Sequence, residues 1–147
     1  MKNNNIITID GPSASGKGLL AKALAKNLNF ILLDSGLLYR AYSYCYDQIN
    51  NHAGAAKLFS NLRIHSIDHE MHVFESNNDI TSILRRENVA KLASKLSSLK
   101  ETRDNLISFQ RETATDNGLV ADGRDMGTVV FPDAGTKIFL VADVDIR

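Results

Sequence analysis

The sequence has one cysteine, no excess of charge and no long apolar run. Each of these shortages excludes a structural feature or a class of partner. Cys45 cannot form an internal disulfide, which predicts a reducing, cytoplasmic location. The 17 basic and 17 acidic residues leave a net charge of zero, so bulk attraction to nucleic acid or membrane is not expected. No segment is apolar over a bilayer's thickness, and the first residues do not resemble a signal peptide. The 147 residues, 44% of them hydrophobic, predict one globular domain, expected to act as a monomer.

What the sequence does contain is a glycine-rich stretch at residues 10–17, Asp-Gly-Pro-Ser-Ala-Ser-Gly-Lys. It follows the apolar run Ile6–Ile9 and precedes a segment with helical spacing. A strand, a glycine-rich turn and a helix that begins at a lysine are typical of a phosphate-binding loop, or P-loop. Glycines let backbone N–H groups approach phosphate oxygens, while the helix N-terminus and the lysine add positive charge. The residues expected to hold nucleotide phosphates are Gly11, Pro12, Ser13, Ala14, Ser15, Gly16, Lys17 and Gly18.

One position of this loop departs from the usual pattern. The residue after the lysine is normally Ser or Thr, whose hydroxyl helps to hold Mg²⁺. Here Gly18 and Leu19 follow Lys17, so neither position supplies a hydroxyl. A metal ion would then be held by water, by phosphate oxygens and by other side chains. Asp122 ends a later apolar strand and is the acid expected to face Mg²⁺ through water.

The apolar pattern predicts an α/β fold with a parallel sheet. Strands are expected at residues 5–10, 30–33, 119–122 and 137–141. A helix that begins near residue 18 should connect the first two strands as a parallel crossover. Its expected apolar stripe consists of Leu20, Ala23, Leu24 and Leu28. Sheets of this kind bind ligands at the carboxyl ends of their strands, where the glycine-rich stretch lies.

Between the second and third strands, a different pattern predicts helices and a small insertion. Helices are expected at 37–49, 53–62, 82–97 and 100–116, the last ended by Asn117-Gly118, and another opens at 143–147. Apolar and polar residues alternate in 63–67 and in 71–75, on either side of a turn at 68–70. Residues 76–79 form a further turn, and the pattern predicts an antiparallel meander. His65, His69 and His72 fit either a metal site or exposed histidines, and their mixed spacing favours exposed histidines.

Three stretches together resemble the bacterial cytidylate kinase family of P-loop nucleoside monophosphate kinases. They are the P-loop, the segment Leu33-Asp34-Ser35-Gly36 with Tyr39-Arg40, and residues 121–132, which read ADGRDMGTVVFP. Members of that family use ATP and Mg²⁺ to phosphorylate CMP or dCMP in pyrimidine nucleotide metabolism. The resemblance implies a three-layer α/β/α core, with a monophosphate-binding subdomain that carries the β insertion at about residues 36–100. It covers the whole chain but about the first two thirds of the family's length, which predicts a chain truncated at its C-terminus.

The resemblance also implies roles for individual residues. It assigns Lys17 and Arg124 to catalysis. It places Ser35, Arg40 and Arg124 at the CMP phosphate and sugar, and Ser94, Arg103 and Asp125 at the cytosine. These residue types suit the ligand, because an arginine can bind phosphate through two parallel hydrogen bonds and a carboxylate can accept from the cytosine amino group. Without the resemblance, Arg40 and Arg103 would be interpreted as surface charges on helices.

The implied reaction is in-line phosphoryl transfer, in which positioning and charge neutralisation supply the rate and no general base is needed. Two alternatives stay open. Another small-molecule P-loop kinase, such as one for AMP or shikimate, would share the P-loop and the crossover, but not residues 121–132 or the insertion. An inactive nucleotide-binding fragment would fit the missing hydroxyl after Lys17.

Overall fold

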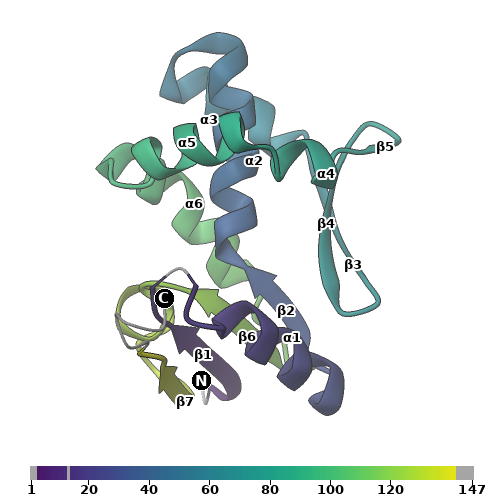
Figure 1. Ribbon diagram of the computed structural model, residues 1–147, viewed down its shortest axis with the longest axis vertical. Helices are drawn as coiled ribbons and strands as arrows, with labels where there is room; N and C mark the ends of the chain where they lie inside the picture. The colour runs from purple at the N-terminus through teal and green to yellow at the C-terminus, as the bar shows by residue number, and fades with distance from the viewer. Residues whose placement is uncertain (1–2, 13, 142–147) are drawn as a thin grey trace. The chain divides into compact units, whose positions relative to one another are not determined.

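The computed structural model describes residues 3–12 and 14–141, which form two compact units (Figure 1). Unit 1 comprises the described parts of residues 1–35, 68–70 and 110–147, and unit 2 comprises residues 36–67 and 71–109. No helix among the described residues is both long enough and apolar enough to cross a membrane. The helix expected at 143–147 lies outside the described residues.

Unit 1 is built on a four-stranded parallel sheet in the order β2-β6-β1-β7 (Figure 1). The strands are β1 (Asn3–Asp10), β2 (Ile31–Asp34), β6 (Leu119–Gly123) and β7 (Ala134–Phe139). All four strands expected from the sequence are present, which confirms the α/β class. The last was expected at 137–141 but lies earlier, because pairing with β1, from Thr136 opposite Ile7 to Phe139 opposite Asp10, sets its range.

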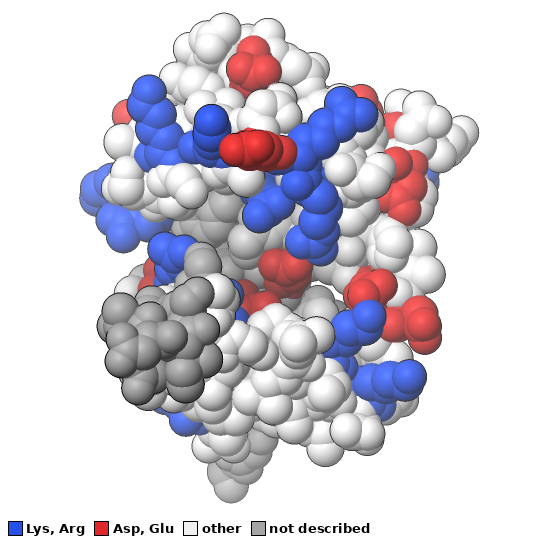
Figure 2. Space-filling view, in the orientation of Figure 1, with Lys and Arg blue, Asp and Glu red and all other residues white. Residues whose placement is uncertain are grey.

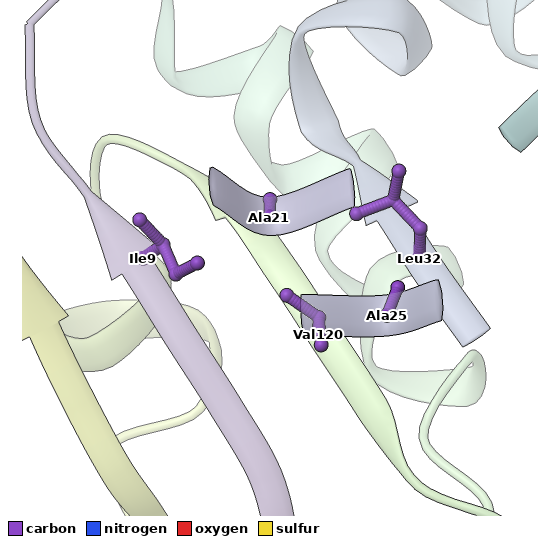
Figure 3. Close-up of a cluster of buried hydrophobic side chains, with 5 residues drawn as sticks. All are labelled: Ile9, Ala21, Ala25, Leu32 and Val120. Atoms are coloured by element: carbon purple, nitrogen blue, oxygen red, sulfur yellow. The ribbon is translucent and has the colours of Figure 1, made fainter. Parts of the chain in front are cut away.

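Helix α1 (Lys17–Leu28) covers one face of this sheet. The cluster between them consists of Ile9, Ala21, Ala25, Leu32 and Val120 (Figure 3). The expected stripe was partly wrong, because Ala23 is exposed and Leu28 is 45% exposed, while Leu20 and Leu24 only flank the cluster. The two buried alanines of α1 face the sheet instead, since small side chains let the helix lie close to the strands.

The opposite face of β1 packs against a π-helical turn, η1 (Met126–Val130), which the sequence did not predict. Side chains alternate along a strand, so Thr8 and Asp10 lie on the face opposite Ile9. A Cβ atom at Gly127 would lie 2.7 Å from the Thr8 Oγ1. This close approach requires glycine at position 127, because only a residue without a Cβ atom lets the turn pack directly against the strand.

Five helices contain most of unit 2. They are α2 (Ser35–Ile49), α3 (His52–Ser60), α4 (Thr81–Leu84), α5 (Glu87–Leu96) and α6 (Lys100–Glu112). The single helix expected at 82–97 was wrong, because Arg86 has extended backbone (φ −65°, ψ 151°) and separates α4 from α5. Leu84 and Val89 are both buried although five residues apart, a spacing that one continuous helix would place on different faces. The break allows both to reach the core.

Helix α6 ends at Glu112 and not at residue 116, so Asn117-Gly118 does not cap it. Gly118 instead precedes β6 with a left-handed φ of 97°, and a Cβ atom there would lie 2.3 Å from the Phe30 ring. Glycine is therefore required at this position by both its backbone conformation and its neighbour.

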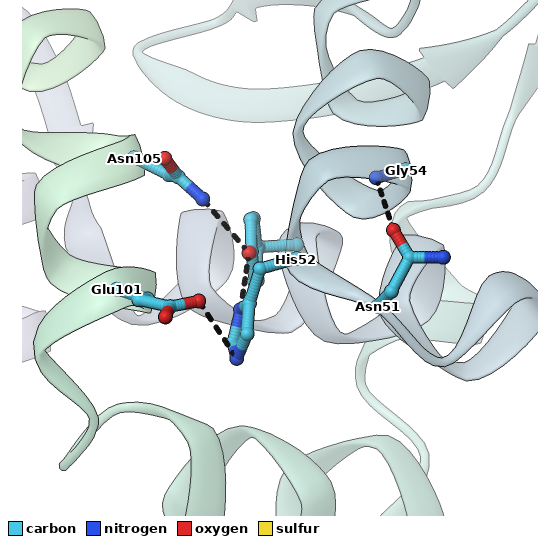
Figure 4. Close-up of polar contacts among 6 residues, drawn as sticks. Asn51, His52, Gly54, Glu101 and Asn105 are labelled. Atoms are coloured by element: carbon cyan, nitrogen blue, oxygen red, sulfur yellow. Dashed lines mark hydrogen bonds and ion pairs between the residues drawn. The ribbon is translucent and has the colours of Figure 1, made fainter.

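A polar cluster joins α2, α3 and α6 within unit 2 (Figure 4). Asn51 caps α3 by accepting a hydrogen bond from the backbone N–H of Gly54 at 2.6 Å. The hydroxyl of buried Tyr42 lies 2.8 Å from the His52 Nδ1 and accepts from the Asn105 amide at 3.1 Å. The buried hydroxyl of Tyr42 is thus paired, which avoids the cost of an unmet hydrogen bond.

The antiparallel insertion is confirmed, with strands β3 (Arg63–Ile67), β4 (Glu70–Glu75) and β5 (Asn78–Asp79). Asp68 and His69 form the first turn with positive φ values of 52° and 62°, the backbone of a tight hairpin. The second turn is shorter than the expected 76–79, because β5 pairs with β4. No group of three His, Cys, Asp or Glu residues in the described part of the chain is arranged to hold a metal ion.

Candidate functional site

The glycine-rich loop leaves β1 at the carboxyl end of the sheet and has the backbone that its residues predict. A Cβ atom at Gly11 would lie 2.7 Å from the Leu140 carbonyl oxygen, so a larger residue does not fit there. Gly16, with a left-handed φ of 86°, is the residue directly before α1. Ala14 is also left-handed, with φ at 61°. Ser13 lies outside the described residues.

Helix α1 begins at Lys17 with an N-terminus suited to an anion. Among the described residues no side chain caps this end, and the first turn of the 12-residue helix contains no acidic residue. The partial positive charge of the helix dipole is therefore not offset locally. The Oγ of Ser15 is buried and has no hydrogen-bond partner among the described residues. These features together favour a phosphate group as the ligand of the loop.

Lys17 and Asp122 form an ion pair at this end of the sheet. The Lys17 Nζ lies 3.4 Å from the Asp122 Oδ1, and both side chains are largely buried. Burial raises the pKa of the Asp122 carboxyl, the Lys17 ammonium lowers it, and the nearby charges of Asp34 and Asp10 raise it further. Lys17 thus partly neutralises the carboxylate of Asp122, which lies near two other strand-end acids.

The residues around Asp122 fit a magnesium ion held through water. The Asp122 Oδ1 is buried and has no hydrogen bond in the described structure, although Lys17 is near. A Cβ atom at Gly18 would lie 3.8 Å from the Asp122 Oδ2, so position 18 faces the carboxylate but supplies no hydroxyl. Leu19 is 80% exposed and supplies none either. One carboxylate without a partnering hydroxyl suits a hydrated ion better than a directly coordinated one.

Three of the residues expected at the acceptor nucleotide lie at the same end of unit 1. Ser35 is buried at the start of α2, and a Cβ atom at Gly123 would lie 2.5 Å from the Ser35 Oγ. Arg124, which is exposed, and Asp125, which is half-buried, follow directly. The structure therefore brings Ser35, Arg124 and Asp125 to the carboxyl end of the sheet, where the P-loop also begins.

The other three expected acceptor residues belong to unit 2. The half-buried Arg40 guanidinium donates a hydrogen bond to the Leu84 carbonyl oxygen at 3.4 Å. Ser94 on α5 and Arg103 on α6 are exposed. Figure 2 shows basic side chains gathered over α4 and α5, a region that contains Arg85, Arg86, Lys91 and Lys95. This face of unit 2 is thus locally positive although the chain has no net charge.

Two residues that hold the segment after β6 were not predicted from the sequence. The carboxylate of Asp10 accepts hydrogen bonds from the backbone N–H groups of Met126 and Gly127. Arg111 donates hydrogen bonds to the carbonyl oxygens of Val129 and Val130. An acid at the end of a strand is a visible signal. Its partners lie more than a hundred residues further along the chain, so spacing alone could not identify them.

A parallel sheet, a glycine-rich loop that opens a helix, and a lysine beside a strand-end acid define a P-loop nucleotide-binding protein. A family model described as "Cytidylate kinase" matches residues 7–147. The chain therefore belongs to the cytidylate kinase family. This confirms the resemblance seen in the sequence and removes the alternative of a P-loop kinase from another family.

Curated relatives agree with the family match. The chain is 43% identical to the cytidylate kinase of Mannheimia succiniciproducens, over 100% of this chain and 68% of the relative. It is 42% identical to cytidylate kinase 2 of Haemophilus influenzae, over 97% of this chain and 67% of the relative. It is also 41% identical to a bifunctional pantoate ligase/cytidylate kinase of Prochlorococcus marinus, over 100% of this chain and 30% of that longer protein. The similarity thus extends over essentially the whole chain.

Proposed function

We propose that this protein transfers the γ-phosphate of ATP to CMP or dCMP, giving CDP or dCDP. The observation that carries the proposal is the placing of Lys17 beside Asp122, next to the P-loop, in a chain of the cytidylate kinase family. Both nucleotides are anionic, and this site combines a lysine with a helix N-terminus that no described side chain caps.

In this proposal the P-loop binds ATP. Backbone N–H groups of the P-loop, to which Pro12 contributes none, surround the β-phosphate, and the Lys17 ammonium reaches the outer phosphates. The pair with Asp122 holds the lysine side chain near the loop before ATP arrives. Asp122 would hold a magnesium ion through water, and the ion would supply positive charge that offsets the charge of the phosphates.

The acceptor nucleotide has two sets of proposed contacts. Ser35, Arg40 and Arg124 bind the phosphate and sugar of CMP, and Ser94, Arg103 and Asp125 bind the cytosine. A dianionic phosphate matches arginine, whose fixed fork donates two parallel hydrogen bonds. A carboxylate and a guanidinium match the amino donor and the ring acceptors of cytosine. The acceptor residues of unit 2 lie within the proposed monophosphate-binding subdomain, at about residues 36–100, or just after it.

The proposed chemistry requires little from the protein beyond position and charge. A phosphate oxygen of CMP, already ionised at neutral pH, attacks the γ-phosphorus of ATP in line with the leaving ADP oxygen. No general base is needed, so Lys17 and Arg124 act by holding the reactants and stabilising charge in the transition state.

Two further features belong to the proposal. We infer a cytoplasmic location, because the one cysteine, Cys45, is buried and unpaired. Burial raises the pKa of its thiol to about 12, which keeps it unreactive. We also infer that the protein acts as a monomer, which its mass in solution tests directly.

Release of ADP in the presence of CMP, dCMP, AMP, UMP or no acceptor tests the proposed function. We expect turnover with CMP and dCMP that exceeds turnover with AMP, UMP or no acceptor. Similar rates with AMP would contradict the cytosine assignment. ATP binding without turnover on any acceptor would support the inactive nucleotide-binding alternative.

A further inference from the structure

Asp10 holds the segment after β6 in two separate ways. It is the last residue of β1 and directly precedes Gly11. Its Oδ1 and Oδ2 accept hydrogen bonds from the backbone N–H groups of Met126 and Gly127, each at 2.8 Å. Its backbone is the register partner of Gly123 in the parallel pairing of β1 with β6. The two residues between these anchors, 124 and 125, are thus fixed at both ends by one residue.

Burying the carboxylate of Asp10 at this position costs free energy. The residue is 5% exposed, and its charge is one of those that raise the pKa of Asp122. A buried carboxylate costs free energy unless charge-assisted hydrogen bonds replace its water. Both of its oxygens accept such bonds, and both partners are backbone groups of the turn η1. A residue needed only to fill the strand would be apolar, as Ile9 is.

Arg111 holds the other end of the same turn. Its Nε donates to the Val130 carbonyl oxygen at 3.1 Å, and its Nη2 donates to the Val129 carbonyl oxygen at 3.0 Å. Backbone N–H groups at the start of a helical turn and carbonyl oxygens at its end lack partners within the turn. Here a carboxylate satisfies the first set and a guanidinium satisfies the second, in the orientation that the turn's dipole favours.

We propose that Asp10 is a positioning residue for the acceptor nucleotide, fixing Arg124 and Asp125 relative to the P-loop, and that Arg111 secures the same turn from its other end. The proposal rests on the roles given to Arg124 and Asp125 in the proposed function. Because the P-loop begins at the residue after Asp10, one strand end determines the separation of the two loops. In-line transfer is sensitive to such placement, since a displacement of about 1 Å can reduce the rate by about 10²-fold.

Asp10→Asn in the purified protein tests the proposal, with Thr8→Val as the matched control. Asparagine has the shape of aspartate, but its NH₂ group would face a backbone N–H, so one of the two hydrogen bonds is lost. Thr8 lies on the same face of the same strand and also contacts the turn, but its Oγ1 has no hydrogen-bond partner in the described structure. Valine at position 8 therefore disturbs the packing between strand and turn without removing a hydrogen bond.

We expect Asp10→Asn to raise the KM for CMP by roughly 10- to 100-fold and to lower kcat. A rise of this size corresponds to the loss of one hydrogen bond to a charged group. The dissociation constant of ATP, measured without CMP, should change less than about twofold, because the P-loop backbone is retained. Amide hydrogen exchange should become at least about tenfold faster at whichever of Met126 and Gly127 loses its hydrogen bond. Thr8→Val should leave all three quantities within about twofold of the parent protein.

An unchanged KM for CMP in Asp10→Asn, or equal changes in the two variants, would overturn the proposal. If Asp10→Asn does not fold, Arg111→Lys decides, since lysine keeps the charge but loses the fork. Arg111→Lys should raise the KM for CMP, by less than the rise expected for Asp10→Asn. An unchanged KM for CMP in Arg111→Lys would overturn the proposal. A parent protein without CMP-dependent turnover would contradict the proposed function. The exchange rates would then decide alone, with unchanged rates in Asp10→Asn counting against positioning.

Discussion

The ammonium of Lys17 lies 3.4 Å from the carboxylate of Asp122, so the P-loop lysine already has an anionic partner in the protein alone. The pair joins the first turn of α1 to the end of β6, two elements that are adjacent in space but far apart in the sequence. It holds a flexible side chain near the loop, which reduces the entropy that ATP binding must remove.

Lys17→Met should reduce turnover by about 10²-fold or more, because it removes a cation from a site where transition-state charge develops. Methionine retains much of the aliphatic stem, so the loop should remain folded. Steady-state kinetics and a thermal melt measure both effects. Lys26→Met, an exposed position on the same helix, is the control and should have normal turnover. Near-normal turnover in Lys17→Met would contradict the role given to this lysine.

Asp122→Asn should stabilise the protein at neutral pH while lowering the proposed Mg²⁺-dependent turnover. Burial raises the pKa of Asp122 above its unfolded value. The folded state therefore binds the proton more tightly than the unfolded state, and the ionised carboxylate costs stability above that pKa. A neutral isostere removes this cost. For a chain of this size, each 1 kcal/mol corresponds to about 2–4 °C in Tm.

Thermal melts at pH 7 and titration of activity with Mg²⁺ measure these two effects. Asp104→Asn, which removes an exposed carboxylate paired with Lys100, should change neither quantity appreciably. A lower Tm for Asp122→Asn would mean that the Lys17 pair outweighs the cost of burial, contrary to this prediction.

Arg40→Ala should weaken CMP binding by about 10- to 100-fold, since it removes the proposed bidentate contact to the CMP phosphate. ATP binding should be unaffected, because the P-loop does not include this residue. Calorimetry with each nucleotide separates the two. The control is Arg63→Ala, which removes an exposed arginine of unit 2 that bonds the Ser76 carbonyl oxygen. Equal losses for ATP and CMP would show a general structural effect instead of a specific one.

Gly118→Ala should destabilise the protein by about 1–3 kcal/mol through overpacking, with a further cost for the left-handed backbone. The new Cβ would lie 2.3 Å from the Phe30 ring, at a φ of 97°. Denaturant unfolding measures the loss. Gly54→Ala in α3 is the control. Its Cβ would lie 2.5 Å from the Cδ1 of Ile49 and 3.0 Å from the Asn51 Oδ1, both side-chain atoms that can move, and alanine favours a helix. Similar stability losses for the two variants would contradict the special requirement at Gly118.

Much of the core and the P-loop could be predicted from the sequence, because their signals are local. The run Ile6–Ile9, the glycines that follow it and Lys17 lie within a dozen residues, and each predicts the structure found there. Helix ends were predicted less well. The break at Arg86 and the end of α6 at Glu112 depend on which side chains reach the core, and not on strong stop signals.

By itself, the sequence determined the α/β class, the phosphate loop and the family, since the first two follow from short-range periodicity and glycine placement and the third from the segment 121–132. Only the tertiary structure decided that Asp10 would bind Met126 and Gly127, and that Gly127 would lie against Thr8. The physical reason is that such contacts join residues more than a hundred positions apart. Local alternation shows which side chains share a face of a strand. Strand order, and therefore which distant residues face one another, is not encoded in local spacing.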